Sequence, residues 1–183
     1  MALKSTIFKA DLQIADLDRS YYGDHALTIA QHPSETDERM MVRLLAFALH
    51  ADDALMFGRG LSDEEEPDLW RKDLTGAIQL WIDVGLPDER RVRKASGRSD
   101  AVIVYAYGRG ADIWWEQNAR ALNRIDNLQV RRITADGSQA LAALARRTMT
   151  LQATLQEGQV FVTDGSETAT LDPVELKAAT GRR

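Results

Sequence analysis

The sequence contains no cysteine. This absence excludes disulfides, thiolate metal ligands and a cysteine nucleophile, and it is compatible with a reducing compartment. Long apolar runs are also missing. No segment approaches the roughly 20 apolar residues of a membrane-spanning helix, and residues 1–16 lack the apolar stretch of a signal peptide. We therefore expect a cytoplasmic protein with no membrane partner.

Positive charge is in the minority. Lysine and arginine together number 23, against 28 aspartates and glutamates, so the formal net charge is −5. Such a protein is not coated in basic surface for non-specific nucleic-acid binding, although a local positive patch is compatible with this charge. A length of 183 residues suits one domain that buries a core without disulfides. We predict a single α/β (α+β) domain over residues 1–183.

The two ends of the chain are predicted to carry β-hairpins. Apolar and polar residues alternate from Phe8 to Ile14, which is the period of a half-buried strand, and residues 21–30 form its partner within an N-terminal hairpin over 1–33. The C-terminal extension, 108–183, is predicted to contain helices at 111–123 and 138–147, a strand at 128–133, a hairpin over 149–164 and a terminal helix at 172–179.

Residues 34–107 form the central unit of the predicted domain. Ser34 is a suitable N-cap for a helix over 35–50. A short strand at 55–57 precedes a hairpin whose turn is at Thr75 and Gly76. Strand, helix and strand then follow in the order of a right-handed βαβ unit. Its parts are the strand ending at Val84, a helix capped by Asp88, and a buried strand at 100–107.

Glu38 is the first candidate site residue. The i, i+4, i+7, i+11 spacing of Glu38, Val42, Leu45 and Leu49 places the acid on the packed side of the helix. The alternative is a first-turn glutamate whose carboxylate reaches solvent.

The hairpin supplies two further acids. Directly opposed carboxylates repel one another, and a divalent cation offsets that cost. Mg²⁺, or Mn²⁺, suits one or two carboxylates completed by waters and a substrate phosphate. Asp73 lies near the turn and ranks second to Asp68. A turn at Thr75 and Gly76 makes three pairs directly opposed: Asp68 with Asp83, Trp70 with Trp81, and Lys72 with Gln79.

This order of elements and acids resembles the αβββαβ core of the PD-(D/E)XK, or restriction-endonuclease-like, nuclease superfamily. Longer stretches, which together cover essentially the whole chain, resemble the YaeQ family: HPSETDERMMVRLLAFAL, EEPDLW, LWIDVGLPDERRVRKA, IWWEQN and LQATLQEGQVFVTD. The YaeQ resemblance implies a variant of the restriction-endonuclease-like fold. We expect its core to have a mixed central sheet, with the terminal hairpins as additions.

The superfamily resemblance implies a metal site. Asp68 and Asp83 would hold Mg²⁺ or Mn²⁺, Glu38 would complete the shell directly or through water, and the metal would lower the pKa of a water that attacks the phosphodiester. The superfamily also has a lysine two residues after the second-strand acid, where this chain has Gly85.

The missing cation is predicted to come from the helix that follows Asp83. We expect Lys94 to supply it, with Arg91 as the second choice, because both lie just beyond the strand. The alternative is an exposed basic face that pairs with Asp88 and Glu89.

Three functions are compatible with these residues. The first is a Mg²⁺-dependent nuclease. The second is a catalytically inactive nucleic-acid-binding or transcription-related regulatory protein, because the basic residues of 89–98 could attract a polyanion. The third is an interaction module whose acids are structural. The histidines show no metal-ligand spacing and are predicted to be structural; they are His25, His32 and His50.

Overall fold

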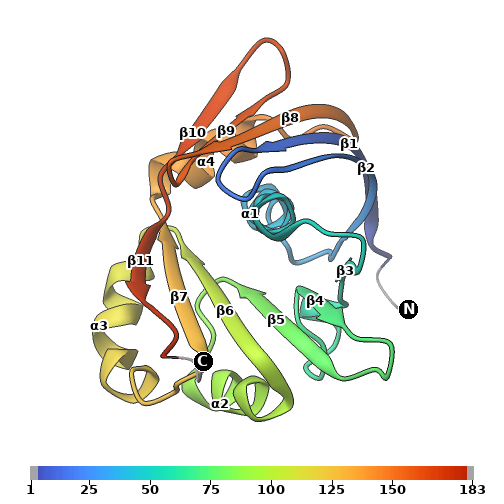
Figure 1. Ribbon diagram of the computed structural model, residues 1–183. Helices are drawn as coiled ribbons and strands as arrows, with labels where there is room; N and C mark the ends of the chain where they lie inside the picture. The colour runs from blue at the N-terminus through green and yellow to red at the C-terminus, as the bar shows by residue number, and fades with distance from the viewer. Residues whose placement is uncertain (1–3, 181–183) are drawn as a thin grey trace. The chain divides into compact units, whose positions relative to one another are not determined.

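The structure is a computed structural model in which residues 4–180 are described. The chain divides into two compact units, which are coloured by residue number in Figure 1. Unit 1 comprises Met1–Leu49 and Thr134–Pro173, and unit 2 comprises His50–Ile133 and Val174–Arg183. Each unit is built on its own mixed sheet.

Unit 1 contains a five-stranded sheet in the order β10-β9-β8-β1-β2. β1 and β8 are parallel, and the other neighbours are antiparallel. The strands are β1 (Thr6–Asp16), β2 (Tyr21–Gln31), β8 (Thr148–Gln156), β9 (Gln159–Thr163) and β10 (Thr168–Leu171), and the helices are α1 (Asp37–His50) and α4 (Ala135–Ala143). The alternation along β1 buries Phe8, Ala10, Leu12 and Ile14, as predicted.

Unit 2 contains a six-stranded sheet in the order β11-β7-β6-β5-β4-β3. β5, β6 and β7 are parallel, which confirms the predicted βαβ order. The strands are β3 (Leu55–Phe57), β4 (Leu69–Lys72), β5 (Ile78–Val84), β6 (Ser99–Tyr107), β7 (Leu128–Ile133) and β11 (Val174–Lys177). The helices are α2 (Glu89–Arg98), α3 (Ala111–Leu122) and the short 3-10 helix η1 (Gly60–Ser62).

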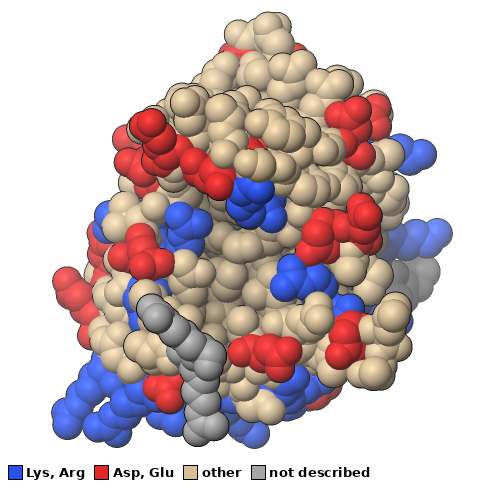
Figure 2. All heavy atoms as spheres, viewed as in Figure 1, with Lys and Arg blue, Asp and Glu red and all other residues tan. Residues whose placement is uncertain are grey.

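One face of the unit 2 sheet is covered by α2 and α3. Trp81 of β5, Val92 of α2, Val104 of β6 and Trp114 of α3 share a buried apolar cluster there. The outer surface of these helices is basic: Lys and Arg side chains gather along the lower edge of Figure 2, over α2 and α3. The packing of α2 on β5 positions the candidate site.

The α+β class and the mixed sheet predicted for the core are confirmed, and the described residues form a second mixed sheet that was not predicted. Both terminal hairpins form as predicted, and they lie outside the sheet of unit 2. They join each other through the parallel pairing of β1 with β8, over a long separation in sequence. No described helix is long and apolar enough to cross a membrane.

The terminal helix predicted at 172–179 is instead strand β11. It pairs antiparallel with β7, and the Lys177 Nζ donates to the Leu128 carbonyl at 2.8 Å. If residues 174–177 were helical, the N–H and C=O groups along the open edge of β7 would have no partners there. Pairing with β7 therefore makes this segment a strand.

Two predicted helix starts were also wrong. The segment before α1 uses Thr36 as the cap, because its Oγ1 accepts from the Arg39 N–H at 3.1 Å, whereas the Ser34 hydroxyl lies 2.6 Å from His32 Nδ1. α4 spans 135–143 rather than 138–147, since the Thr134 side chain accepts from the Gly137 N–H and starts the helix earlier.

Candidate functional site

The β4–β5 hairpin has the register that the sequence predicts near its acidic end. Trp70 pairs with Trp81, and their ring centroids are 6.2 Å apart in an edge-to-face arrangement. Leu69 pairs with Ile82, so the same register continued by one residue places Asp68 opposite Asp83.

The register changes toward the turn. Lys72 pairs with Ile78, not with Gln79 as predicted, because an irregularity follows Arg71. The Lys72 Nζ lies 3.7 Å from the centre of the Trp70 ring, a cation–π contact. Asp73 accepts from the N–H groups of Thr75 and Ala77 and therefore stabilises the turn itself.

Asp68 lies immediately before β4 and is only 2% exposed. Its Oδ2 accepts from the Val84 N–H at 2.8 Å, so the side chain takes the place of a backbone acceptor just before β4 begins. The backbone of Gly60 packs against the same carboxylate: a Cβ there would lie 2.5 Å from Asp68 Oδ1. Both contacts are those of a structural acid.

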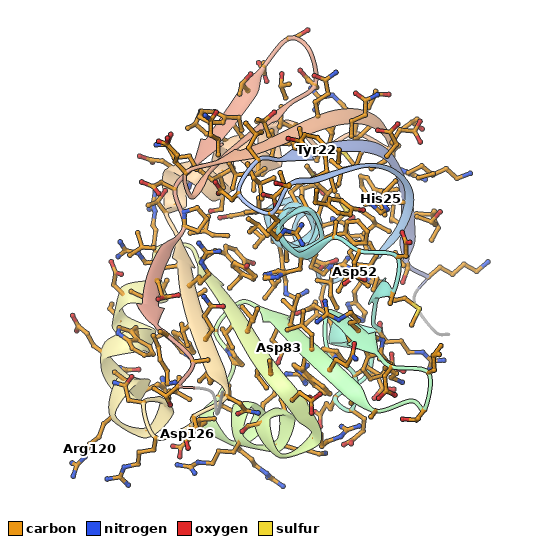
Figure 3. All side chains as sticks on the ribbon, viewed as in Figure 1. Tyr22, His25, Asp52, Asp83, Arg120 and Asp126 are labelled. Atoms are coloured by element: carbon orange, nitrogen blue, oxygen red, sulfur yellow. The ribbon has the colours of Figure 1, made fainter. Side chains whose placement is uncertain are left out.

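Asp83, labelled in Figure 3, is also 2% exposed and faces Arg91 of α2. Arg91 Nε donates to Oδ2 at 2.8 Å and Nη2 donates to Oδ1 at 3.0 Å. The same guanidinium donates to the Glu64 and Glu66 carbonyls, at 3.1 Å each. This bidentate pair ties β5, α2 and the loop before β4 together.

Lys94, the first choice for the missing cation, pairs with Glu65 instead of the hairpin acids. Arg98 donates to the backbone carbonyl of the same residue at 3.0 Å. The Lys94 hydrogen bond holds the pKa of Glu65 below its usual value. Arg91 reaches Asp83 because it lies in the first turn of α2, next to the end of β5, whereas Lys94 lies nearly one turn further along the helix.

Glu38 belongs to unit 1, where its carboxylate contacts α4. Its Oε1 accepts from the buried Ser138 Oγ at 2.5 Å. Glu38 is half-buried, which agrees with the packed-side interpretation. A serine donor gives this carboxylate a structural partner within its own unit.

The hairpin acids do not fit a metal ion in this arrangement. Both oxygens of Asp83 accept from Arg91, and one oxygen of Asp68 accepts from Val84. Within residues 4–180, no group of three His, Asp or Glu side chains is arranged to hold an ion. A metal here would have to displace the Arg91 guanidinium, so the Mg²⁺ site stays a prediction.

A pocket of about 350 Å³ lies beside the Asp83–Arg91 pair. Trp81, only 2% exposed, lines it, and its indole Nε1 has no hydrogen-bond partner among the described residues. The remaining lining residues come from α2, from the residue before it and from the acidic loop that precedes β4, residues 63–66: Glu64, Asp88, Arg90, Arg91, Lys94 and Ala95. Sequence reasoning assigned Trp81 only to a cross-strand pair and so missed this pocket.

Unit 2 carries exposed basic residues on both of its helices. Arg90, Arg93, Lys94 and Arg98 are exposed on α2, and Arg120 projects outward from α3 in Figure 3. Arg93 is paired with Glu89 one turn away. No ion pair engages Arg90 among residues 4–180. The surface therefore offers cations to a polyanion in spite of the net negative charge.

The sequence matches the family model described as YaeQ protein over residues 1–173. The chain belongs to the YaeQ family. YaeQ of Salmonella typhi is 49% identical over 165 residues, covering 90% of this chain and 91% of that protein. YaeQ of Escherichia coli strain K12 is 47% identical over the same length and coverage. Both relatives are described as uncharacterized, so they carry no activity over to this chain.

Crystal structures of YaeQ proteins share the fold. The protein from Xanthomonas axonopodis pv. citri is 52% identical with a TM-score of 0.92, covering 95% of this chain and 99% of that one. The protein from Pseudomonas syringae is 38% identical, also with a TM-score of 0.92, covering 97% and 98%. These structures confirm the YaeQ resemblance and the mixed α+β architecture.

Proposed function

We propose that this YaeQ protein binds nucleic acid through α2 of unit 2, and that Asp68 and Asp83 are structural. The observation that carries the proposal is the bidentate contact of Arg91 with Asp83. Both carboxylate oxygens of Asp83 accept hydrogen bonds from the Arg91 guanidinium. The contact also fixes the first turn of α2 against β5, while Arg90 and Lys94 of the same helix are exposed.

The charges on α2 are spaced for contact with a phosphate backbone. Arg90, Lys94 and Arg98 follow one another at intervals of four residues, so they form one stripe on the helix with successive Cβ atoms about 6 Å apart. We call these three residues the α2 stripe. Lysine and arginine contacts to phosphates supply most sequence-independent affinity for nucleic acid.

Glu65 partly neutralises this stripe. Its carboxylate pairs with Lys94 and approaches Arg98 at 3.4 Å. All three side chains are substantially exposed, so solvent screens these pairs and each is weak. A polyanion that offers several phosphates would displace the single carboxylate.

The test is binding of fluorescein-labelled oligonucleotides, read by anisotropy in a buffer containing a chelator. Substitution of the α2 stripe by glutamine should weaken binding at least tenfold and lower the slope of log K against log salt by roughly 2 to 3. The matched control replaces Lys4, Lys9 and Arg146, exposed cations of unit 1, by glutamine. Equal affinities for wild type and the stripe variant would refute the proposal.

A metal-dependent nuclease of the PD-(D/E)XK type is the second candidate. Two observations favour it. The hairpin register, continued by one residue, puts Asp68 opposite Asp83, and Arg91 of the following helix contacts Asp83. It requires Arg91 to give up Asp83 to a metal. Calorimetric titration with Mn²⁺ separates the two: the nuclease requires binding that is lost in Asp68→Asn with Asp83→Asn, whereas structural acids predict no heat in either protein.

A further inference from the structure

We propose that the open edge of β2 in unit 1 pairs antiparallel with β2 of a second copy of this chain. β2 is one edge of the five-stranded sheet and lies beside β1 in Figure 1. It spans eleven residues, Tyr21–Gln31, and its register with β1 runs without a break. The proposal goes beyond the proposed function, because it concerns the other unit and requires no nucleic acid.

The main-chain groups of alternate β2 residues point away from β1. The Lys9 N–H donates to the Arg147 carbonyl at 2.9 Å, on the side of β1 that pairs with β8. In an antiparallel pair, directly opposed residues exchange both of their hydrogen bonds or neither. Thr28 is opposite Lys9, so the Thr28 N–H and C=O point to the open edge, as do those of every second residue along β2.

Four exposed residues leave these main-chain groups without a hydrogen-bond partner within residues 4–180: Tyr22, Asp24, Ala26 and Thr28. At the next such position, the Ala30 carbonyl accepts from Arg43 Nη2 at 3.0 Å, which marks one end of the open stretch. A row of unpaired N–H and C=O groups is a template for a further strand.

This edge lacks the features that keep other sheet edges from pairing. Edges are commonly protected by short strands, bulges, proline or lysine. Within the described residues the other three sheet edges are short, since β10 and β11 have four residues each and β3 has three. β2 has no bulge against β1, and its sequence contains no proline, lysine or arginine. Among these four edges of residues 4–180, β2 is the one that is long enough and open enough to accept a strand.

A second copy of β2 fits the edge because the strand is complementary to itself. A two-fold axis at Ala26 pairs all eleven residues with residues of the other copy. Residues that point to the open edge then face one another, with Ala26 opposite Ala26 and Asp24 opposite Thr28 of the other copy. An axis at Asp24 would instead oppose two carboxylates, which destabilises a strand pair.

Charge complementarity also favours the register centred on Ala26. In this register Thr28 lies between Lys9 of its own copy and Asp24 of the other. The acid and the lysine are therefore two strand spacings apart, about 10 Å at the backbone, and they share the exposed face of the sheet. Lys9 forms no ion pair with any residue in 4–180, so its flexible side chain is available to reach across Thr28. A symmetric pair makes this contact twice.

Sedimentation equilibrium of the full chain over roughly 1 to 200 μM tests the pairing. We expect wild type to approach twice the chain mass of 20.4 kDa at the highest concentration. Ala26→Lys and Ala26→Glu each oppose two like charges and should stay monomeric, whereas an equimolar mixture of the two should form a heterodimer. Ala77→Lys is the control, because it makes the same change at an exposed alanine of unit 2, and it should dimerise as wild type does.

Amide hydrogen exchange of the wild-type protein gives a second readout that depends on no variant. The N–H groups of Ala26 and Thr28 become hydrogen-bonded in the pair, so their exchange should slow several-fold from the lowest to the highest concentration. A single-chain mass over the whole range overturns the proposal and would leave the edge to a strand of another protein. A dimer that survives equally in both Ala26 variants, or exchange at Ala26 and Thr28 that is independent of concentration, overturns it as well.

Discussion

Arg91 and Lys94 were both candidates for the cation near Asp83, and the structure gives them different environments. Asp83 is buried, so Arg91→Ala would leave its carboxylate without a counter-charge; we expect a loss of about 3 kcal/mol in the free energy of unfolding. Lys94 and Glu65 are 51% and 60% exposed, so Lys94→Ala should cost less than about 1 kcal/mol. Urea denaturation measures both, and equal losses would contradict this assignment.

Glu65 should restrain nucleic-acid binding, because its carboxylate lies against Lys94 and Arg98 of the α2 stripe. We expect Glu65→Gln to raise the affinity for an oligonucleotide several-fold. Glu167→Gln is the matched control, since it makes the same change of net charge at an exposed position in unit 1. The anisotropy assay compares them, and an equal gain in both variants would indicate a general charge effect.

The ion pair of Asp52 with Arg71 should make the stability of the protein sensitive to acid. Partial burial raises the pKa of Asp52. The hydrogen bond from Arg71 at 2.7 Å and those from backbone N–H groups lower it, and together they outweigh burial, so the pKa lies below its ordinary value of 3.8. A carboxyl with a lowered folded-state pKa stabilises the protein above its unfolded pKa and loses that contribution as the pH falls through the folded value.

The measurement for Asp52 is the free energy of unfolding of wild type and Arg71→Gln across pH 7 to pH 2.5. The advantage of wild type should be fully present at neutral pH and should shrink below about pH 4. A difference that stays constant down to the lowest pH would show that Arg71 does not act through the Asp52 carboxylate.

Sequence patterns predict pairings between residues of one hairpin, but not pairings between distant segments. The opposed positions of Trp70 and Trp81 follow from turn position and strand period, and both are visible locally. The pairing of Glu65 with Lys94 joins segments far apart in sequence. A run of acids facing a later run of bases was its only signal, and such runs are more often simply solvated.

At the scale of elements, the junction of η1 with β4 depends on close packing of backbone against Asp68. Gly60 has φ +51°, and a Cβ there would meet the buried carboxylate at 2.5 Å. Gly60→Ala should therefore lower the free energy of unfolding by about 3 kcal/mol, from backbone strain and the clash together.

Gly76 is the control for this prediction. It also has a positive φ, +88°, but a Cβ there would meet nothing within 4 Å. Gly76→Ala should cost only the backbone term, about 1 to 2 kcal/mol. Thermal or urea unfolding compares the two variants, and equal losses would show that Asp68 is not tightly enclosed.

Local patterns predict the elements whose boundaries depend on local chemistry. The Asp88 cap of α2 and the turn between β8 and β9 were correctly placed for this reason. β11 was not, because only the open edge of β7 makes that segment a strand. The start of α4 was missed because Thr134, not the buried Ser138, caps it.

At the scale of the whole molecule, the predicted mixed sheet is accompanied by a second one, which the terminal hairpins form together. The decisive pairing, β1 with β8, links the beginning of the chain to residues 148–156. Both strands show the same alternation, which identifies each as half-buried but not as neighbours. Long-range pairing is a property of the assembled chain, so single-sequence patterns predicted the hairpins and not their union.

The net charge of the chain does not show how charge is distributed over its surface. The net charge of −5 argues against a basic protein surface, yet folding gathers the α2 stripe on one helix of unit 2. We propose that this stripe binds nucleic acid without a metal.

The most direct measurement is oligonucleotide affinity of the wild-type protein in a chelator-containing buffer, from 50 to 300 mM salt. We predict binding near micromolar Kd at low salt, with log K falling by roughly 3 per unit of log salt. Binding that is absent without Mg²⁺ or Mn²⁺ and appears on adding either would contradict it.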